Sequence, residues 1–275
     1  MRLFTAFVVF LVSLTAQSQD AVEITQQMFS KTKEIKTLTY TMIKKERLED
    51  EMMRQVSEVK LQRKPFKVYT RQLSPDEGLE VLYHASDKTA LINPNGFPWI
   101  NIRLDPFGSR MTSGQHHTIL DSGFDRFVNI LEHLFKKYAA RIDQMAQIKQ
   151  VTVDGRDYWQ LNFNNSQFDI IDYTVKPDDH LLKIGHERHL SAYMVVLLND
   201  DVDDYHDIES GQVIKIPNDY SPKMELLIDQ ELMVPVEIKV YFRNELFEHY
   251  QFSRLDINPD LQEDAFSSKC EDYGF

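Results

Sequence analysis

The sequence contains one cysteine, Cys270, among 275 residues, and only nine glycines and ten prolines. A single cysteine cannot form an internal disulfide or a cysteine-rich zinc site, so we expect an unpaired thiol in a polar tail. The low glycine and proline content excludes collagen-like and low-complexity chains. An excess of basic charge is also missing, because 43 acidic side chains outnumber 31 basic ones and leave a net charge of −12. Nucleic acid is therefore not expected as a partner, since phosphate binding needs a basic face.

Long hydrophobic runs are missing except at the N-terminus, where residues 3–14 are almost entirely apolar. Arg2 precedes this run, and Ala16-Gln17-Ser18 follows it with small residues at the −3 and −1 positions of a cleavage site. The pattern predicts a secretory signal peptide over residues 1–18, and the run is short for a bilayer span. An uncleaved anchor is the alternative. We therefore expect export across the inner membrane to the periplasm, and no transmembrane segment in the mature chain.

Apolar and polar side chains alternate over many short segments, which is the pattern of strands with one buried face. Residues 38–43 and 236–242 are the clearest cases. Further strands are predicted over residues 56–63, 66–73, 79–84, 88–93, 99–104, 148–153, 158–163, 223–229 and 247–257. Helices are predicted over residues 21–36 and 124–138. Together they indicate an α+β protein with an antiparallel sheet of about eleven strands and two helices.

The second predicted helix carries a continuous apolar stripe with helical spacing. The stripe consists of Phe124, Phe127, Val128, Leu131, Leu134, Phe135 and Tyr138. Asp121 or Ser122 is expected to cap the helix N-terminus. A helix with such a stripe is apolar enough to lie against a concave sheet.

The order of these elements and four short segments resemble the DUF1571 branch of the LolA-like superfamily of bacterial periplasmic proteins. The segments are YTMIKKE, KPFKVY, GLEVLY and DPFG, at residues 40–46, 64–69, 78–83 and 105–108. The resemblance implies a LolA-like open β half-barrel, formed by residues 19–168 and 221–275, with a helical lid over its concave face. Its cleft would hold a lipid, a lipoprotein acyl chain or an apolar peptide, and the stripe would line the cleft or lid. A filled core is the alternative, because inward apolar residues have the same pattern in both cases.

Residues 169–220 interrupt the series of strands. Their flanks, residues 164–167 and 221–222, are rich in turn-forming residues. Without the insert, residues 158–163 and 223–229 would form the two strands of one hairpin. Inside it the pattern predicts a strand, two short helices and a second strand, so the insert is expected to be a βααβ module at a hairpin tip.

Two segments of the insert, YTVKPDDHLLKI at residues 173–184 and IESGQVIKIP at 208–217, resemble a LysM domain. The resemblance implies binding of peptidoglycan or another N-acetylglucosamine glycan between two loops. The implied contact residues are Pro177, Asp178, Asp179, His180, Leu181, Asn199, Val202, Tyr205 and Ile208. In the first loop, Asp178 and His180 stand where the family usually has glycine and threonine. The alternative is a LysM-like spacer or protein-docking module.

Complete metal-binding and catalytic motifs are missing. The acidic run at residues 199–207 lacks the glycine and glutamate that an EF-hand requires. His186 and His189 are three positions apart, whereas a HExxH zinc pair needs four. No P-loop, dinucleotide-binding glycine motif or G-x-S-x-G sequence occurs. Neither a metal nor a cofactor is expected, and the chain is not expected to be an enzyme.

These observations predict an exported envelope protein that binds peptidoglycan through its insert and lipid in its half-barrel. The alternative is a non-enzymatic scaffold or sensor with a filled barrel and a protein-docking insert.

Overall fold

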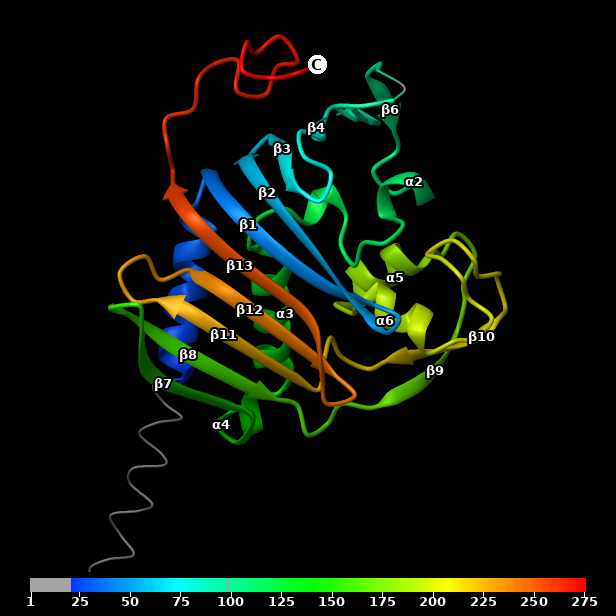
Figure 1. Ribbon diagram of the computed structural model, residues 1–275. Coiled ribbons are helices and arrows are strands. Elements are labelled where there is room, and N and C mark those ends of the chain that lie inside the picture. The colour runs from blue at the N-terminus through cyan, green and yellow to red at the C-terminus, as the bar shows by residue number, and fades with distance from the viewer. Residues whose placement is uncertain (1–20, 98) are drawn as a thin grey trace, which may run out of the picture.

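The computed structural model describes residues 21–97 and 99–275, and the predicted signal peptide lies outside this range. One antiparallel sheet of eleven strands dominates it, in the order β6-β5-β4-β3-β2-β1-β13-β12-β11-β8-β7 (Figure 1). The strands are β1 Thr37–Leu48, β2 Glu51–Arg63, β3 Phe66–Ser74, β4 Glu80–His84, β5 Ala90–Asn93, β6 Ile102–Leu104, β7 Ala146–Val153, β8 Arg156–Asn164, β11 Lys223–Asp229, β12 Pro235–Phe242 and β13 Glu245–Ile257. The predicted α+β class with a large open antiparallel sheet is confirmed.

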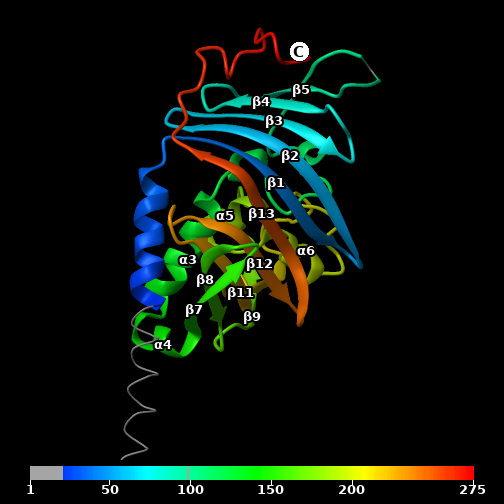
Figure 2. The same cartoon turned by 60° about the vertical axis from the view of Figure 1, so that its left-hand side comes forward.

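Helices cover one face of this curved sheet (Figures 1 and 2). Residues 21–34 form the described part of the first helix. The others outside the insert are α2 Ser109–Thr112, η1 Ile119–Asp121, α3 Asp125–Lys137, η2 Ala139–Arg141 and α4 Ile142–Met145. Within the described residues, no helix is long and apolar enough to cross a bilayer.

Strand alternation explains which face of the sheet is covered. On β1, Leu38 and Tyr40 are buried under the helices, while Thr39 between them is partly exposed. Val59 and Leu61 follow the same rule on the neighbouring strand β2. A period of two therefore places one apolar set on the concave face, where the main core forms.

The insert leaves and returns at two paired strands. Strands β8 and β11 are antiparallel neighbours, with Asn164 opposite Lys223 and Tyr158 opposite Asp229, so the predicted hairpin is confirmed. The insert contains β9 Ile170–Thr174, α5 Leu181–Arg188, α6 Ala192–Leu197 and β10 Val213–Pro217, and its two strands pair with each other. The predicted βααβ order is thus present, while membership of the LysM family stays a prediction.

The start of α3 differs from the prediction. Neither Asp121 nor Ser122 caps this helix, which begins at Asp125 after Phe124. Asp121 closes the short helix η1 instead, where it forms a capping box with Thr118. Gly123, with φ of +93° and Leu61 close to the position of a Cβ, turns the chain between the two helices.

The C-terminal segment after β13 packs on the outer face of β3 and β4. Tyr273 stacks on Tyr69 with ring centroids 3.7 Å apart, and Phe266 is buried beside Leu82. Cys270 is unpaired but buried in this segment, so the prediction of a thiol in a solvated tail is wrong. Three aromatic residues within ten positions of Cys270 fold the tail onto the sheet, a signal that composition alone does not give.

Candidate functional site

A cleft of about 410 Å³ opens between the concave face of the first strands and residues 102–123. Its apolar wall consists of Met42, Val59, Leu79, Val81, Ile92, Ile102, Leu104, Met111, Ile119, Phe127 and Phe252. Polar side chains also border it, among them Lys44, Gln115, His117 and Asp121. The cleft is within the size range of small-molecule sites. Such a mixture suits a ligand that is apolar along most of its length and polar at one end.

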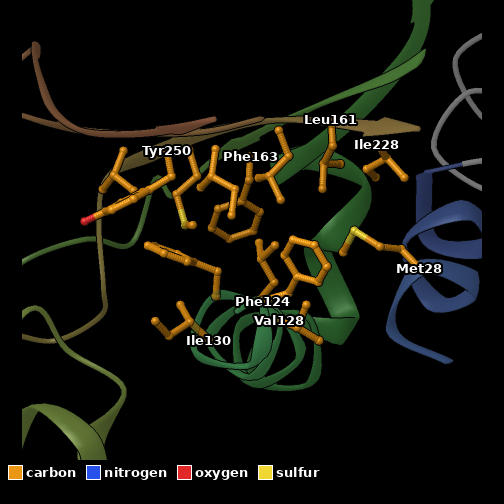
Figure 3. Close-up of a cluster of buried hydrophobic side chains, with 14 of the residues drawn as sticks. Met28, Phe124, Val128, Ile130, Leu161, Phe163, Ile228 and Tyr250 are labelled. Carbon is orange, nitrogen blue, oxygen red and sulfur yellow. The ribbon is translucent and has the colours of Figure 1, made fainter. Parts of the chain in front are cut away.

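The predicted lid stripe does not line this cleft, apart from Phe127. Phe124, Val128, Leu131, Leu134 and Phe135 are buried in the main core. Figure 3 shows Phe124 and Val128 of this segment facing Leu161 and Phe163 of β8, with side chains filling the space between them. The barrel is therefore filled beneath α3, and the open space lies at the other end of the concave face.

Tyr138, the last residue of the stripe, is only partly buried. Its hydroxyl donates a hydrogen bond of 2.5 Å to Asp219 at the end of the insert. Lys137 contacts the same carboxylate at 2.6 Å, so the C-terminus of α3 is fixed to the insert. The prediction that Tyr138 lines the cleft is wrong for this reason.

Two buried glutamates lie beside the polar part of the cleft. Glu46 of β1 and Glu248 of β13 are directly opposite each other in the sheet and are almost inaccessible to solvent. Like charges at such positions are unfavourable unless they are compensated. Lys44 compensates Glu46 at 3.2 Å, and Tyr250 donates to it at 2.6 Å.

The second glutamate is compensated by histidines and a tyrosine. Glu248 lies 2.9 Å from Nδ1 of His116 and 3.6 Å from Nε2 of His117, and it accepts a bond of 2.8 Å from Tyr220. Nε2 of His116 lies 2.8 Å from the carbonyl oxygen of Arg47. Both nitrogens of His116 thus face oxygen atoms, which fix the ring between β1 and β13.

The environment of this cluster favours the charged forms of Glu46, Glu248 and His117. Burial alone would raise the pKa of Glu248, but the charges and hydrogen bonds of His117 and His116 hold it well below 4.5. Burial likewise opposes ionisation of Glu46, yet Lys44 and the same histidines lower its pKa. For His117, burial lowers the pKa, and the nearby carboxylates, Glu248 first, outweigh this effect and raise it above 6.5.

These directions predict a stability maximum in weakly acidic solution. The pKa of Glu248 is 4.5 in the unfolded chain and lower in the folded protein. It therefore contributes stability that is fully present above pH 4.5 and is lost as the pH falls from there through the folded pKa. The pKa of His117 is 6.5 in the unfolded chain and higher in the folded protein. It therefore contributes stability that is fully present below pH 6.5 and is lost as the pH rises through the folded pKa. Urea unfolding between pH 3 and 9 should therefore give the highest midpoint between these limits. A midpoint that keeps rising below pH 4.5 would contradict the assignment.

Four of the predicted glycan-binding residues are buried. Leu181, Val202 and Tyr205 belong to the insert's own hydrophobic core. Asn199 uses its amide to bond the carbonyl oxygens of Val195 and Lys215 and the N–H of Lys215. These side chains hold the module together, so their prediction as sugar contacts is wrong.

The remaining predicted contacts are mostly engaged within the insert. Asp179 accepts hydrogen bonds from Tyr173 and from the N–H of Lys176. His180 caps α5, and Ile208 packs against the insert's core. Among the predicted contacts, only Pro177 and Asp178 are exposed.

The two predicted sugar-binding loops face the half-barrel. The Tyr205 hydroxyl donates a hydrogen bond to the carbonyl oxygen of Gln115. Nε2 of His206 lies 2.8 Å from the carbonyl oxygen of Phe107. Leu181 also donates its N–H to Tyr205 at 2.9 Å, which joins the loops to each other. Phe107 also lies beside the His180 ring of the first loop, so residues 107–115 of the barrel contact both loops.

A second set of contacts also fixes the insert to the half-barrel. Arg126 of α3 is buried and donates to the carbonyl oxygens of Gly185 and Leu190 at 3.0 and 2.7 Å. His186, considered above as half of a metal pair, contacts Asp121 at 3.1 Å. Among the described residues, no group of three or more histidine, cysteine, aspartate or glutamate side chains could hold a metal ion.

Sequence reasoning missed the buried cluster, although part of its signal was visible. On β1, Lys44 and Glu46 continue the inward-facing set of Leu38, Tyr40 and Met42, so two charged residues stand at inward positions. Charge at an inward position of a strand is costly unless it is paired. His116 and His117 are adjacent in the sequence, and nothing near them points to their partners on β1 and β13.

The chain is similar to known proteins in sequence and in fold. The family model described as "Protein of unknown function (DUF1571)" matches residues 35–173, which is half of the chain. No curated protein matches the sequence. Similar solved structures include a DUF1329 family protein from Desulfovibrio piger, with 8% identity. The match covers 92% of this chain and 98% of that chain, with a TM-score of 0.37. A second is the lipoprotein LppX of Mycobacterium tuberculosis, with 8% identity; the match covers 89% of this chain and 98% of that chain, with a TM-score of 0.41. A third is a LolA superfamily protein from Nitrosomonas europaea, with 11% identity; the match covers 90% of this chain and 97% of that chain, with a TM-score of 0.34.

Proposed function

This chain belongs to the DUF1571 family, and from that premise we propose that it is an envelope protein whose cleft holds one amphipathic molecule. The matched region, residues 35–173, supplies the whole cleft lining except Tyr250 and Phe252. The ligand would be an acyl chain with a polar end group that accepts hydrogen bonds.

The observation that carries the proposal is the lining of the cleft. Apolar side chains from five strands and from residues 102–123 converge on one open space, although the rest of the concave face is filled. Burying an acyl chain there is favourable by about 0.8 kcal/mol for each methylene group. Lys44 and Gln115, which bond each other beside the cleft, offer donors to the polar end of the ligand.

We propose binding rather than catalysis as the role of the polar cluster. The described hydrogen bonds and ion pairs of His117 involve Glu248, Asp121 and Tyr220, and none involves a serine, threonine or cysteine that could act as a nucleophile. Every carboxylate of the cluster is already paired, which favours a structural and positioning role. The signal-peptide pattern supports the proposed location in the envelope.

The insert has a structural role in this proposal, in place of wall anchoring. Its predicted sugar-binding loops contact residues 107–115, which also border the cleft. Of the predicted contacts, only the exposed Pro177 and Asp178 would remain available for peptidoglycan binding. The scaffold alternative, with a completely filled barrel, is disfavoured by the open cleft.

The test is displacement of a fluorescent fatty acid from purified protein, comparing two tryptophan variants. Met42→Trp places an indole in the cleft and is expected to weaken binding at least about tenfold, because it removes room for two or more methylene groups. Ile43→Trp is the matched control, since the next residue of β1 points to the opposite face of the sheet. Equal affinity of the two variants, or no binding by the wild type, would overturn the proposal.

A further inference from the structure

The connection between β5 and β6 carries three large apolar side chains in solvent. Phe97, Trp99 and Ile100 are 87%, 79% and 62% exposed. No ring pair or cation–π contact within the described residues involves Phe97 or Trp99. In Figures 1 and 2 the connection extends away from the body of the protein beyond β5. We call Phe97, Trp99 and Ile100 the apolar tip.

The surroundings of the apolar tip carry no charge. Residues 93–101, with the sequence NPNGFPWIN, contain no acidic or basic side chain, although 27% of the chain is charged. Asparagine side chains flank the apolar residues on both sides. An uncharged segment with a tryptophan and a phenylalanine has the composition favoured at the interface between water and lipid.

The apolar tip is continuous with the cleft. Ile92 and Pro94 precede it, Ile102 and Leu104 follow it, and all four line the cleft. The strands that hold the tip are therefore walls of the proposed ligand site. A surface that receives the tip would lie next to the cleft.

The geometry points to a bilayer of zwitterionic lipid as the surface on which the apolar tip docks. Three side chains of this kind expose on the order of 500 Å². That is less than the roughly 800 Å² that each partner of a stable protein complex buries. Binding to lipid instead increases with the apolar area inserted, so a small tip can bind reversibly. Because the protein has a net charge of −12, an anionic bilayer would repel it.

The tip itself supplies the probe that tests this docking. The chain has two tryptophans, so Trp159→Phe leaves Trp99 as the only one. With phosphatidylcholine vesicles, Trp99 emission should shift to shorter wavelength and be quenched by brominated lipid. The protein should also float with these vesicles, and less so when phosphatidylglycerol replaces part of the lipid.

Two substitutions of matched exposure complete the experiment. Ile100→Ser should lower vesicle partitioning at least about tenfold, because one apolar side chain no longer enters the lipid. Val213→Ser, at a residue that is also 62% exposed but lies on β10, should leave partitioning unchanged.

The inference is wrong if both variants float like the wild type, or if anionic vesicles bind best. It is also wrong if Ile100→Ser changes only the self-association of the protein. Fatty-acid displacement in solution, without vesicles, should be the same in Ile100→Ser and wild type, so failure of tip docking is distinguishable from failure of cleft binding.

Discussion

Replacing Glu248 with glutamine is expected to lower the free energy of unfolding by about 3–5 kcal/mol, because buried positive charge loses its partner. The Glu248 side chain is inaccessible to solvent and lies 2.9 Å from His116 and 3.6 Å from His117. Glutamine has nearly the same shape, so packing is kept while the ion pairs are lost. The expected loss is a large part of the roughly 5–15 kcal/mol that stabilises a typical domain.

Urea unfolding at pH 6 measures this loss, with Glu245→Gln as the control. Glu245 lies on the same strand and contacts Arg47 at 3.5 Å, but its side chain is 63% exposed. Exposed pairs of this kind contribute at most about 1 kcal/mol. Similar losses in both variants would show that the histidines only offset the cost of burying Glu248.

The sheet could be predicted from the sequence because its information is local. Each strand shows its buried face by alternation, as Leu38 and Tyr40 do on β1. The pairing of β8 with β11 was also predictable, because the turn-forming residues at both ends of the insert marked where a hairpin had been interrupted. Periodicity and turn chemistry act over a few residues, and a single sequence displays them.

The cleft could not be located in this way. The stripe from Phe124 to Tyr138 showed which face of α3 is buried, but a buried face has the same pattern against a filled core and against an open cleft. The structure packs Val128 and Leu131 into a filled core. It places the open space beside Val81 and Ile92, whose alternation is no different from that of other strands.

The polar cluster depends on contacts between distant parts of the chain. Tyr250 bonds Glu46 from 204 positions away, and His116 lies 132 positions from Glu248. No spacing rule covers such distances, so the sequence pattern does not predict these contacts. In the insert, the order of strands and helices could be predicted from local patterns. The contact between Tyr205 and Gln115 could not, because it joins residues 90 positions apart.

Two neighbouring residues of α6 allow the coupling between insert and barrel to be measured. Met194 and Val195 are both fully buried, but Met194 packs in the main core and Val195 in the insert's own core. Met194→Ala is expected to lower the free energy of unfolding by about 2–5 kcal/mol. Val195→Ala removes two methyl groups and is expected to lower it by about 2 kcal/mol.

Both variants should shift one and the same unfolding transition, because the seam between insert and barrel is buried. Arg126 bridges α3 to two carbonyl groups of the insert, and Tyr220, at the end of the insert, is fully buried in the main core. Hydrogen exchange measured separately on β10 and β12 tests this, since both strands should lose protection equally in Val195→Ala. If only β10 loses protection while β12 keeps that of the wild type, the insert unfolds independently. A wall anchor able to leave the barrel would then be physically possible, and the loops at Pro177 and Tyr205 could become accessible to glycan.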